Sequence, residues 1–125
     1  MSSTGADSFS SGYDFVAASK AVLETLCRYL NYRFFDEDVR FNILRSRSIR
    51  TGSFDAHFGP EFGAFARRYT RPHHFLQAEE VANVAVALCS GLLDGVSGQV
   101  LTVDRGTTFF DNLMRLYDER RVPAQ

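Results

Sequence analysis

Two amphipathic helical segments, each followed by a short run of β-branched residues, constrain the fold of this chain most strongly. Apolar side chains recur at three- and four-residue spacings through residues 13–34, and the run VRFNIL at 39–44 is typical of a strand. A second helix is predicted over 78–90, followed by the strand QVLTVD at 99–104. This alternating order favours an α/β layer structure. Two strands are too few for a stable open sheet, so the sequence predicts part of a larger one.

The remaining segments are predicted to be irregular or short. Residues 1–12 are rich in serine and glycine and indicate a loop. Residues 49–75 are irregular and aromatic, with one predicted helix at 61–68. A last helix is predicted over 111–121, with Asp111 as its N-cap.

Composition and charge exclude several classes of protein. The net charge of −1 argues against a nucleic-acid binder, and no apolar run approaches the roughly 20 residues of a membrane span. The first residues are neither basic nor apolar, which argues against a secretory signal. Cys27 and Cys89 lie in apolar helical patterns, which favours buried, unpaired thiols. We therefore expect a reduced, cytoplasmic protein that binds neither membranes nor nucleic acid.

The histidines give no indication of a metal centre. His57, His73 and His74 lack the spacing that metal ligands usually show, and a solvated or core role fits them better. The sequence predicts no metal site.

The run YDFVAASK, from Tyr13 to Lys20, is the strongest candidate for chemistry. Seven residues along a helix turn about 700°, so both side chains lie on one face, roughly 10 Å apart along the axis. A nearby lysine favours the tyrosinate, which makes the phenol a workable proton donor. The same lysine could hydrogen-bond a sugar hydroxyl. Taken alone, the pair could also be a tyrosine at a helix start and a solvated lysine.

Several motifs together resemble the short-chain dehydrogenase/reductase family in order and spacing. The serine pair at 2–3, Tyr-(x6)-Lys, VRFN, IRT, EEVANVAVALCSG and GVSGQVLTVDRG follow one another through residue 110 or so. Most members of that family carry Tyr-(x3)-Lys, which would require a tyrosine at Val16. The Tyr-(x6)-Lys spacing and the stretch SKAVLETLCRYL are similar to the enoyl-(acyl carrier protein) reductase branch.

The resemblance implies a fold as well as a family. It implies the C-terminal part of a Rossmann-type, doubly wound parallel sheet over residues 1–125. The N-terminal dinucleotide-binding half would open with a strand, a Gly-rich turn and a helix, and nothing in this sequence matches that pattern. The resemblance therefore predicts a truncated chain.

The resemblance also implies residue roles. Tyr13 would hydrogen-bond a thioester carbonyl and stabilise the enolate, and Lys20 would hold the nicotinamide ribose. Ser3 would help to polarise the substrate carbonyl, unless it is a plain loop serine. Ile49 and Thr51 match the segment that binds the nicotinamide carboxamide and the pyrophosphate.

The aromatic stretch 54–75, with Phe54 and Phe58, falls where the family carries its substrate-binding lid. An apolar flap suits an acyl chain and excludes water, although core packing is the alternative. The implied reaction is NADH- or NADPH-dependent reduction of a 2,3-enoyl thioester, in fatty-acid or polyketide biosynthesis. The implied partners are an acyl thioester, an acyl carrier protein and further copies of the subunit. A ketoreductase or alcohol dehydrogenase of the same family, and a non-catalytic fragment that acts by association, are the alternatives.

Two loops depart from the family pattern. Arg45-Ser46-Arg47-Ser48 stands where most members have Pro-Gly or Gly-Gly, and Arg105 replaces a glycine in VDRG. Glycine lets a backbone approach a cofactor closely, so the arginines are unexpected there. Arg45 and Arg47 could contact a phosphate of the cofactor or of a carrier-protein arm, or form a solvated basic loop.

Overall fold

The protein is an α/β structure built on a three-stranded parallel sheet. The computed structural model describes residues 1–47, 49, 51–70 and 74–119. In chain order these form β1 (Ser2–Ser3), the 3-10 turn η1 (Thr4–Ala6), α1 (Asp14–Arg33), β2 (Ile43–Ser46), α2 (Gly52–Phe58), α3 (Pro60–Tyr69), α4 (Ala78–Cys89), β3 (Val100–Val103), the 3-10 turn η3 (Thr107–Phe109) and α5 (Asn112–Glu119). The strand order is β1-β2-β3, with both neighbouring pairs parallel.

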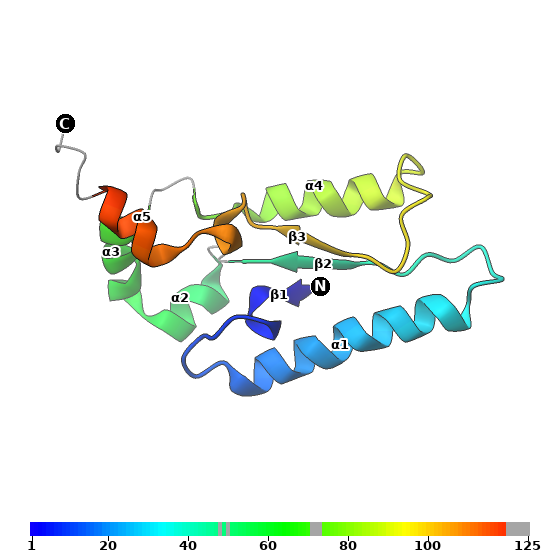
Figure 1. The fold of residues 1–125 in the computed structure, drawn as a ribbon, viewed down its shortest axis with the longest axis horizontal. Coiled ribbons are helices and arrows are strands. Elements are labelled where there is room, and N and C mark those ends of the chain that lie inside the picture. Colours follow the sequence, from blue (N-terminus) through cyan, green and yellow to red (C-terminus); the bar gives the residue numbers. More distant parts are fainter. Residues whose placement is uncertain (48, 50, 71–73, 120–125) are drawn as a thin grey trace.

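Helices α1 and α4 cover opposite faces of the sheet (Figure 1). Successive side chains of a strand point to opposite faces. In β2, Leu44 packs into the cluster that contains Val81 of α4, whereas the next residue, Arg45, bonds to Glu24 of α1. Three layers follow, as expected for a doubly wound sheet. Helices α2, α3 and α5 gather beyond the carboxyl ends of the strands.

The layer under α4 is an ordinary apolar core. Leu76, only 1% exposed, lies with Leu44 and Val81 at its centre, and Val84, Ala85 and Leu88 pack against them. A capping box fixes the start of α4, because Gln77 and Glu80 hydrogen-bond each other's backbone N–H groups. The helix predicted over 78–90 is confirmed within one residue.

The layer under α1 is polar. Phe15, Leu26 and Tyr29, three of the apolar residues that define its periodicity, are exposed by 93%, 50% and 72%. The sheet-facing side instead carries Glu24, which is 4% exposed, and Cys27. An apolar stripe normally faces the core of a globular domain, so the exposure of these three side chains of α1 is unusual.

The predicted strand at 39–44 is shifted, because β2 runs from Ile43 to Ser46. The Phe41 backbone is hydrogen-bonded to the Ser97 hydroxyl and to the N–H of Gly98, not to a neighbouring strand. Asn42 donates to the Val96 carbonyl at 2.6 Å and accepts from the Gln99 N–H, so its role is structural. The prediction that Arg45 and Ser46 lie in a loop is therefore wrong.

Other boundaries differ in smaller ways. Ser2 and Ser3, predicted within a loop, form β1, and the segment predicted to be irregular also contains α2. Helix α3 matches the predicted helix at 61–68 within one residue at each end. Asp111 caps α5 as predicted, since its carboxylate accepts the N–H groups of Leu113 and Met114. Residues 120–121 of that predicted helix lie outside the described residues.

The two cysteines do not share one environment. Both are free thiols, Cys27 buried and Cys89 exposed at the end of α4, so the prediction of burial is wrong for Cys89. Over the described residues, no group of three or more His, Cys, Asp or Glu side chains could hold a metal. His73 and the His57 side chain lie outside the described part of the chain. No helix in that part is long and apolar enough to cross a membrane.

Candidate active site at the carboxyl edge of the sheet

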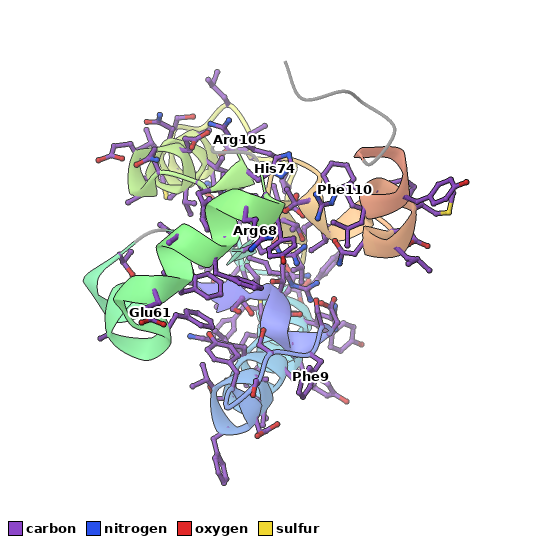
Figure 2. The ribbon with its side chains drawn as sticks, turned by 90° about the vertical axis from the view of Figure 1, so that its left-hand side faces the viewer. Phe9, Glu61, Arg68, His74, Arg105 and Phe110 are labelled. Atoms are coloured by element: carbon purple, nitrogen blue, oxygen red, sulfur yellow. The ribbon has the colours of Figure 1, made fainter. Side chains whose placement is uncertain are left out.

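The candidate residues from β1 and β2 lie at the carboxyl edge of the sheet. Ser3 ends β1, Ile49 and Thr51 follow β2, and Arg105 follows β3. Figure 2 looks onto this edge, with Phe9 in the loop before α1 at one side and Arg105 at the other. In open parallel sheets, ligands bind in the crevice outside the carboxyl ends of the strands. The fold thus places this edge where a substrate site is expected.

Ser3 and Tyr13 are brought together against Gly5. The Ser3 hydroxyl accepts the Gly5 N–H at 3.1 Å and caps η1. A Cβ atom at Gly5 would lie 2.6 Å from two carbons of the Tyr13 ring and 3.4 Å from the Ser3 Oγ. Only glycine allows this approach, since real Cβ contacts are not so short. Gly5 is a residue of the site that the sequence did not reveal, because the constraint on it comes from the Tyr13 ring.

Lys20 lies on the sheet-facing side of α1. Tyr13 is the N-cap residue of that helix, and its carbonyl accepts the Ala17 N–H at 2.8 Å. Two turns further on, Lys20 Nζ donates to the Met1 carbonyl at 3.4 Å. The predicted shared face is thus directed at β1, where Ser3 lies.

A buried ionic network lies directly behind these residues. Arg45 Nε donates to Glu24 Oε1 at 3.0 Å, and the guanidinium also binds Glu24 Oε2 and Asp7 Oδ2. Ser2 Oγ donates to the same Glu24 Oε1 at 2.6 Å. The Arg45 hydrogen bond lowers the pKa of Glu24, and Glu24 in turn raises the pKa of Arg45. Arg45 lies in β2 and in this network, so the solvated loop predicted for it is wrong.

Sequence analysis also missed Glu24 and Asp7. Glu24 follows Lys20 by four residues and so shares its helix face, which was a usable signal. Its burial depends on an arginine 21 residues away in sequence, and no local pattern indicates that.

The segment after β2 is held on both sides. Ile49 forms an isolated parallel bridge with Leu76, and the Thr51 hydroxyl accepts the Phe54 N–H at 3.2 Å. Arg47 is exposed and donates to the Thr107 carbonyl at 2.9 Å, which links the loops after β2 and β3. Ile49 and Thr51, the two residues expected to bind the nicotinamide carboxamide and the pyrophosphate, therefore each have a defined contact beyond the end of β2.

The loop after β3 is organised by Asp104. Burial acts to raise the pKa of this carboxyl, but hydrogen bonds from Thr108 and Gly106 outweigh it and the pKa is lowered. Arg105 adopts a left-handed φ of 54°, the conformation that glycine favours, and forms an ion pair with Glu80. The backbone thus keeps the geometry that the family's glycine would adopt.

Aromatic rings of α2 and α3 pack mainly on one another. Phe54 and Phe58 have ring centroids 4.7 Å apart, and Phe58 stacks on Phe62 at 4.5 Å. Phe75 joins the cluster edge-on to Phe54 at 6.3 Å. Gly59, with φ of 76°, separates the two helices. These rings form a separate aromatic layer over the carboxyl edge, outside the cluster of Leu44, Leu76 and Val81.

Comparison with known proteins identifies the family. Residues 1–108 match the model of the enoyl-(acyl carrier protein) reductase family. The chain belongs to this family. Among curated members, it is 33% identical over 110 residues to the enoyl-(acyl carrier protein) reductase (NADH) of Escherichia coli, and 27% identical over 107 residues to that of Buchnera aphidicola. It is also 31% identical over 90 residues to the 7α-hydroxysteroid dehydrogenase of Escherichia coli.

Solved structures agree with this membership. The 7α-hydroxysteroid dehydrogenase complexed with NADH and 7-oxo glycochenodeoxycholic acid superposes with a TM-score of 0.74 at 28% identity. A short-chain type dehydrogenase/reductase from Mycobacterium ulcerans gives 0.74 at 27% identity. They match 85% and 86% of this chain, but the chain covers only 42% and 40% of theirs. It likewise spans 41% of the two enoyl reductases. The predicted short-chain dehydrogenase/reductase family and doubly wound fold are confirmed.

Proposed function

We propose that this chain is the substrate-side part of an NADH- or NADPH-dependent reductase of 2,3-enoyl thioesters. The observation that carries the proposal is the meeting of Ser3 and Tyr13 against Gly5, with Lys20 seven residues along α1 on the side that faces β1. In the proposal, the phenol and the hydroxyl act at the edge where such sheets bind ligands, and the ammonium acts from the next turns of α1. The enoyl reductase relatives support the choice of substrate class.

In the proposed reaction, bound NAD(P)H supplies the hydride. Tyr13 donates a hydrogen bond to the thioester carbonyl oxygen and stabilises the negative charge that develops there as the enolate forms. Ser3 orients the same oxygen from the opposite side. Such groups accelerate the reaction because they are already aimed at the developing charge.

Residues of this chain fit the nicotinamide end of the cofactor. Among the described residues, Lys20 Nζ is hydrogen-bonded to the Met1 carbonyl alone, at 3.4 Å, so in the proposal its remaining protons bind ribose hydroxyls. The Thr51 hydroxyl already accepts one hydrogen bond, which leaves its proton available for the carboxamide or pyrophosphate. Ile49 contributes backbone groups beside it. We expect the other end of the dinucleotide to need a Gly-rich turn that this sequence does not contain.

The aromatic layer suits an acyl chain. In the proposal, Phe54 and Phe58 line the site, and the hinge at Gly59 lets α2 and α3 close over the substrate. Apolar rings favour a hydrocarbon tail and exclude water while hydride is transferred. An acyl carrier protein is the proposed donor of the thioester, in fatty-acid or polyketide biosynthesis.

The proposed assembly is a dimer or tetramer that uses the exposed apolar face of α1. Leu26 and Tyr29 lie on that face, which also forms a groove along the helix. The cytoplasm is the proposed compartment, since the free thiols Cys27 and Cys89 suit a reducing environment.

The test joins this chain to the preceding part of the Escherichia coli enoyl reductase, a fusion called here the assembled reductase. Crotonyl thioester and a 3-oxoacyl thioester are offered with NADH or NADPH, and loss of cofactor absorbance is followed. We expect reduction of crotonyl thioester. The proposal is wrong if the assembled reductase ignores crotonyl thioester.

A ketoreductase or alcohol dehydrogenase is the second candidate, because the chain is similar to a 7α-hydroxysteroid dehydrogenase in sequence and structure. Efficient reduction of the 3-oxoacyl thioester without the crotonyl activity would support it. A third candidate is a non-catalytic chain that only associates with complete subunits. For the chain alone we expect a dissociation constant for NAD(P)H weaker than about 10 μM, or about 7 kcal/mol.

A further inference from the structure

The network of Glu24, Arg45, Asp7 and Ser2 connects every element that carries the candidate catalytic groups. Glu24 lies on α1 with Tyr13 and Lys20, and Ser2 lies on β1 next to Ser3. Two hydrogen bonds one helical turn apart join α1 to the start of β1. Lys20 Nζ donates to the carbonyl of Met1, just before the strand, and Ser2 Oγ donates to Glu24. These bonds fix the position of α1 along β1 and the rotation of the helix about its own axis.

Arg45 connects these hydrogen bonds to β2, in which it lies, and to the loop that follows η1. Its guanidinium binds both carboxylate oxygens of Glu24 and, with a third nitrogen, the carboxylate of Asp7. Asp7 follows η1, the turn that presents Gly5 to the Tyr13 ring. A planar guanidinium imposes direction on each of these bonds, which a point charge would not do.

Burying the Glu24–Arg45 pair costs free energy, which indicates that the pair has a role beyond stability. The side chains of Glu24 and Arg45 are exposed by only 6% and 15%. Buried ion pairs can often be replaced by apolar residues of similar size with little or no loss of stability. The sheet-facing positions of α4 show that this sheet accepts apolar packing on its other face. An apolar pair would fill the space, but it would not define one register between α1 and β1.

We propose that Glu24, clamped by Arg45 and Ser2, is a positioning residue that sets the register of α1 on β1 and so brings Tyr13 and Lys20 to Ser3. The inference rests on the proposed function for its kinetic consequence. A displacement of about 1 Å at a reacting group can cost about 100-fold in rate, so a loss of register affects turnover more than substrate binding.

The decisive variant is Glu24→Met/Arg45→Met in the assembled reductase. It removes both charges without leaving one buried and unpaired, so stability is expected to stay close to that of the wild type. We expect kcat on crotonyl thioester to fall tenfold or more, with KM changed less than threefold. If the pair served stability alone, a double variant as stable as the wild type would also keep the wild-type kcat. A stable double variant with kcat within twofold of the wild type would overturn the inference.

Two further variants complete the design. Asp94→Asn breaks the 2.9 Å ion pair with Arg40 at the opposite end of the sheet, so it is the matched control and should leave kcat unchanged. Ser2→Ala removes only the hydrogen bond from β1 to Glu24. If the double variant does not fold, Ser2→Ala is the deciding test. We expect its kcat to fall about fivefold, and an unchanged kcat would contradict the inference.

Backbone hydrogen exchange separates this inference from the proposed function. The N–H groups of Gly5, Asp7 and Ser8 are hydrogen-bonded within the turn after β1. In the double variant they should exchange at least tenfold faster, while those of β3 stay unchanged. If the wild-type assembled reductase reduces neither thioester, the proposed function fails and exchange alone decides. Unchanged exchange at these N–H groups would then reject the inference.

Discussion

Helices α1 and α4 cover opposite faces of one sheet, yet they bind to it by different physical means. Helix α4 buries Val81 against Leu44 and Leu76, which gives a dry apolar layer. Helix α1 turns Glu24 towards the sheet and leaves Leu26 half exposed. Apolar packing gives stability without much directional information, whereas hydrogen-bonded charges define one geometry. The contrast indicates that the α4 face stabilises the fold and that the α1 face arranges the candidate site.

The largest expected effect tests the chemical role of α1. In the assembled reductase, Tyr13→Phe should lower kcat by roughly 10²–10⁴-fold, the range for a positioned acid–base group. Cofactor affinity should change little, because the phenol is assigned to the substrate oxygen. Steady-state kinetics and cofactor titration measure the two quantities.

The matched control for that variant is Tyr32→Phe, on the exposed side of the same helix. It removes the same hydroxyl and should leave kcat within twofold. If Tyr13→Phe keeps more than about a tenth of the activity, it has lost less than about 1.4 kcal/mol, too little for the group that stabilises the enolate.

The next-largest effect compares a leucine in the core under α4 with a leucine on the exposed face of α1. Leu76→Ala should reduce the free energy of unfolding by about 2–5 kcal/mol, because it leaves a cavity in the core under α4. Leu26→Ala makes the same change on the exposed face of α1 and should cost less than about 0.5 kcal/mol in a monomer, where that face stays in solvent, and more in the proposed dimer or tetramer. Urea melts of both variants in the assembled reductase give the difference. Equal losses would mean that the Leu26 face is buried there, in a subunit interface.

The sequence predicts the α4 side of the molecule better than the α1 side. The helix over 78–90 and the strand after it are recognisable because the residues that define their pattern also pack in the core. Helix α1 is recognisable too, but its pattern gives no sign that Glu24 is buried. The burial of Glu24 follows from Arg45, which the sequence places in a loop after a mispredicted strand.

The residues of the candidate site also divide into those that the sequence reveals and those that it does not. Tyr13 and Lys20 could be selected from their spacing, and Ser3 from its distance to them. Gly5 could not, because the need for glycine there arises from the Tyr13 ring, which arrives from a different element. Strand β1 is two residues long and is defined only by pairing with β2. Contacts between distant segments, which local propensity does not contain, account for these omissions.

A smaller effect distinguishes the two helices by pH. The Arg45 hydrogen bond lowers the pKa of Glu24 below its ordinary value, so this pair stabilises the fold at neutral pH. The contribution is present above about pH 4.5, the value of an unperturbed carboxyl, and is lost as the pH falls through the lower folded pKa. Urea melts between pH 7 and 3 should therefore show a steeper loss for the wild type than for Glu24→Met/Arg45→Met. The difference should be about 1.5 kcal/mol or more, the worth of a hydrogen bond to a charged group. Parallel curves would show that Glu24 does not titrate with folding.

The smallest expected effect concerns the ion pair on the α4 side, between Glu80 and Arg105. This pair is exposed, and such pairs contribute little to stability. The backbone of Arg105 matters more, because a φ of 54° is strained for any residue with a Cβ. Arg105→Gly and Arg105→Ala both remove the ion pair, and only the glycine variant relieves the strain.

We therefore expect Arg105→Gly to be more stable than Arg105→Ala by about 1 kcal/mol. Thermal or urea unfolding of the two variants measures this difference without any assumption about the ion pair, since neither variant contains it. Equal stabilities would show that the left-handed turn is not retained in solution. The expected result would show that the Cβ atom at position 105 strains this turn, a property of the backbone that does not depend on the ion pair with Glu80.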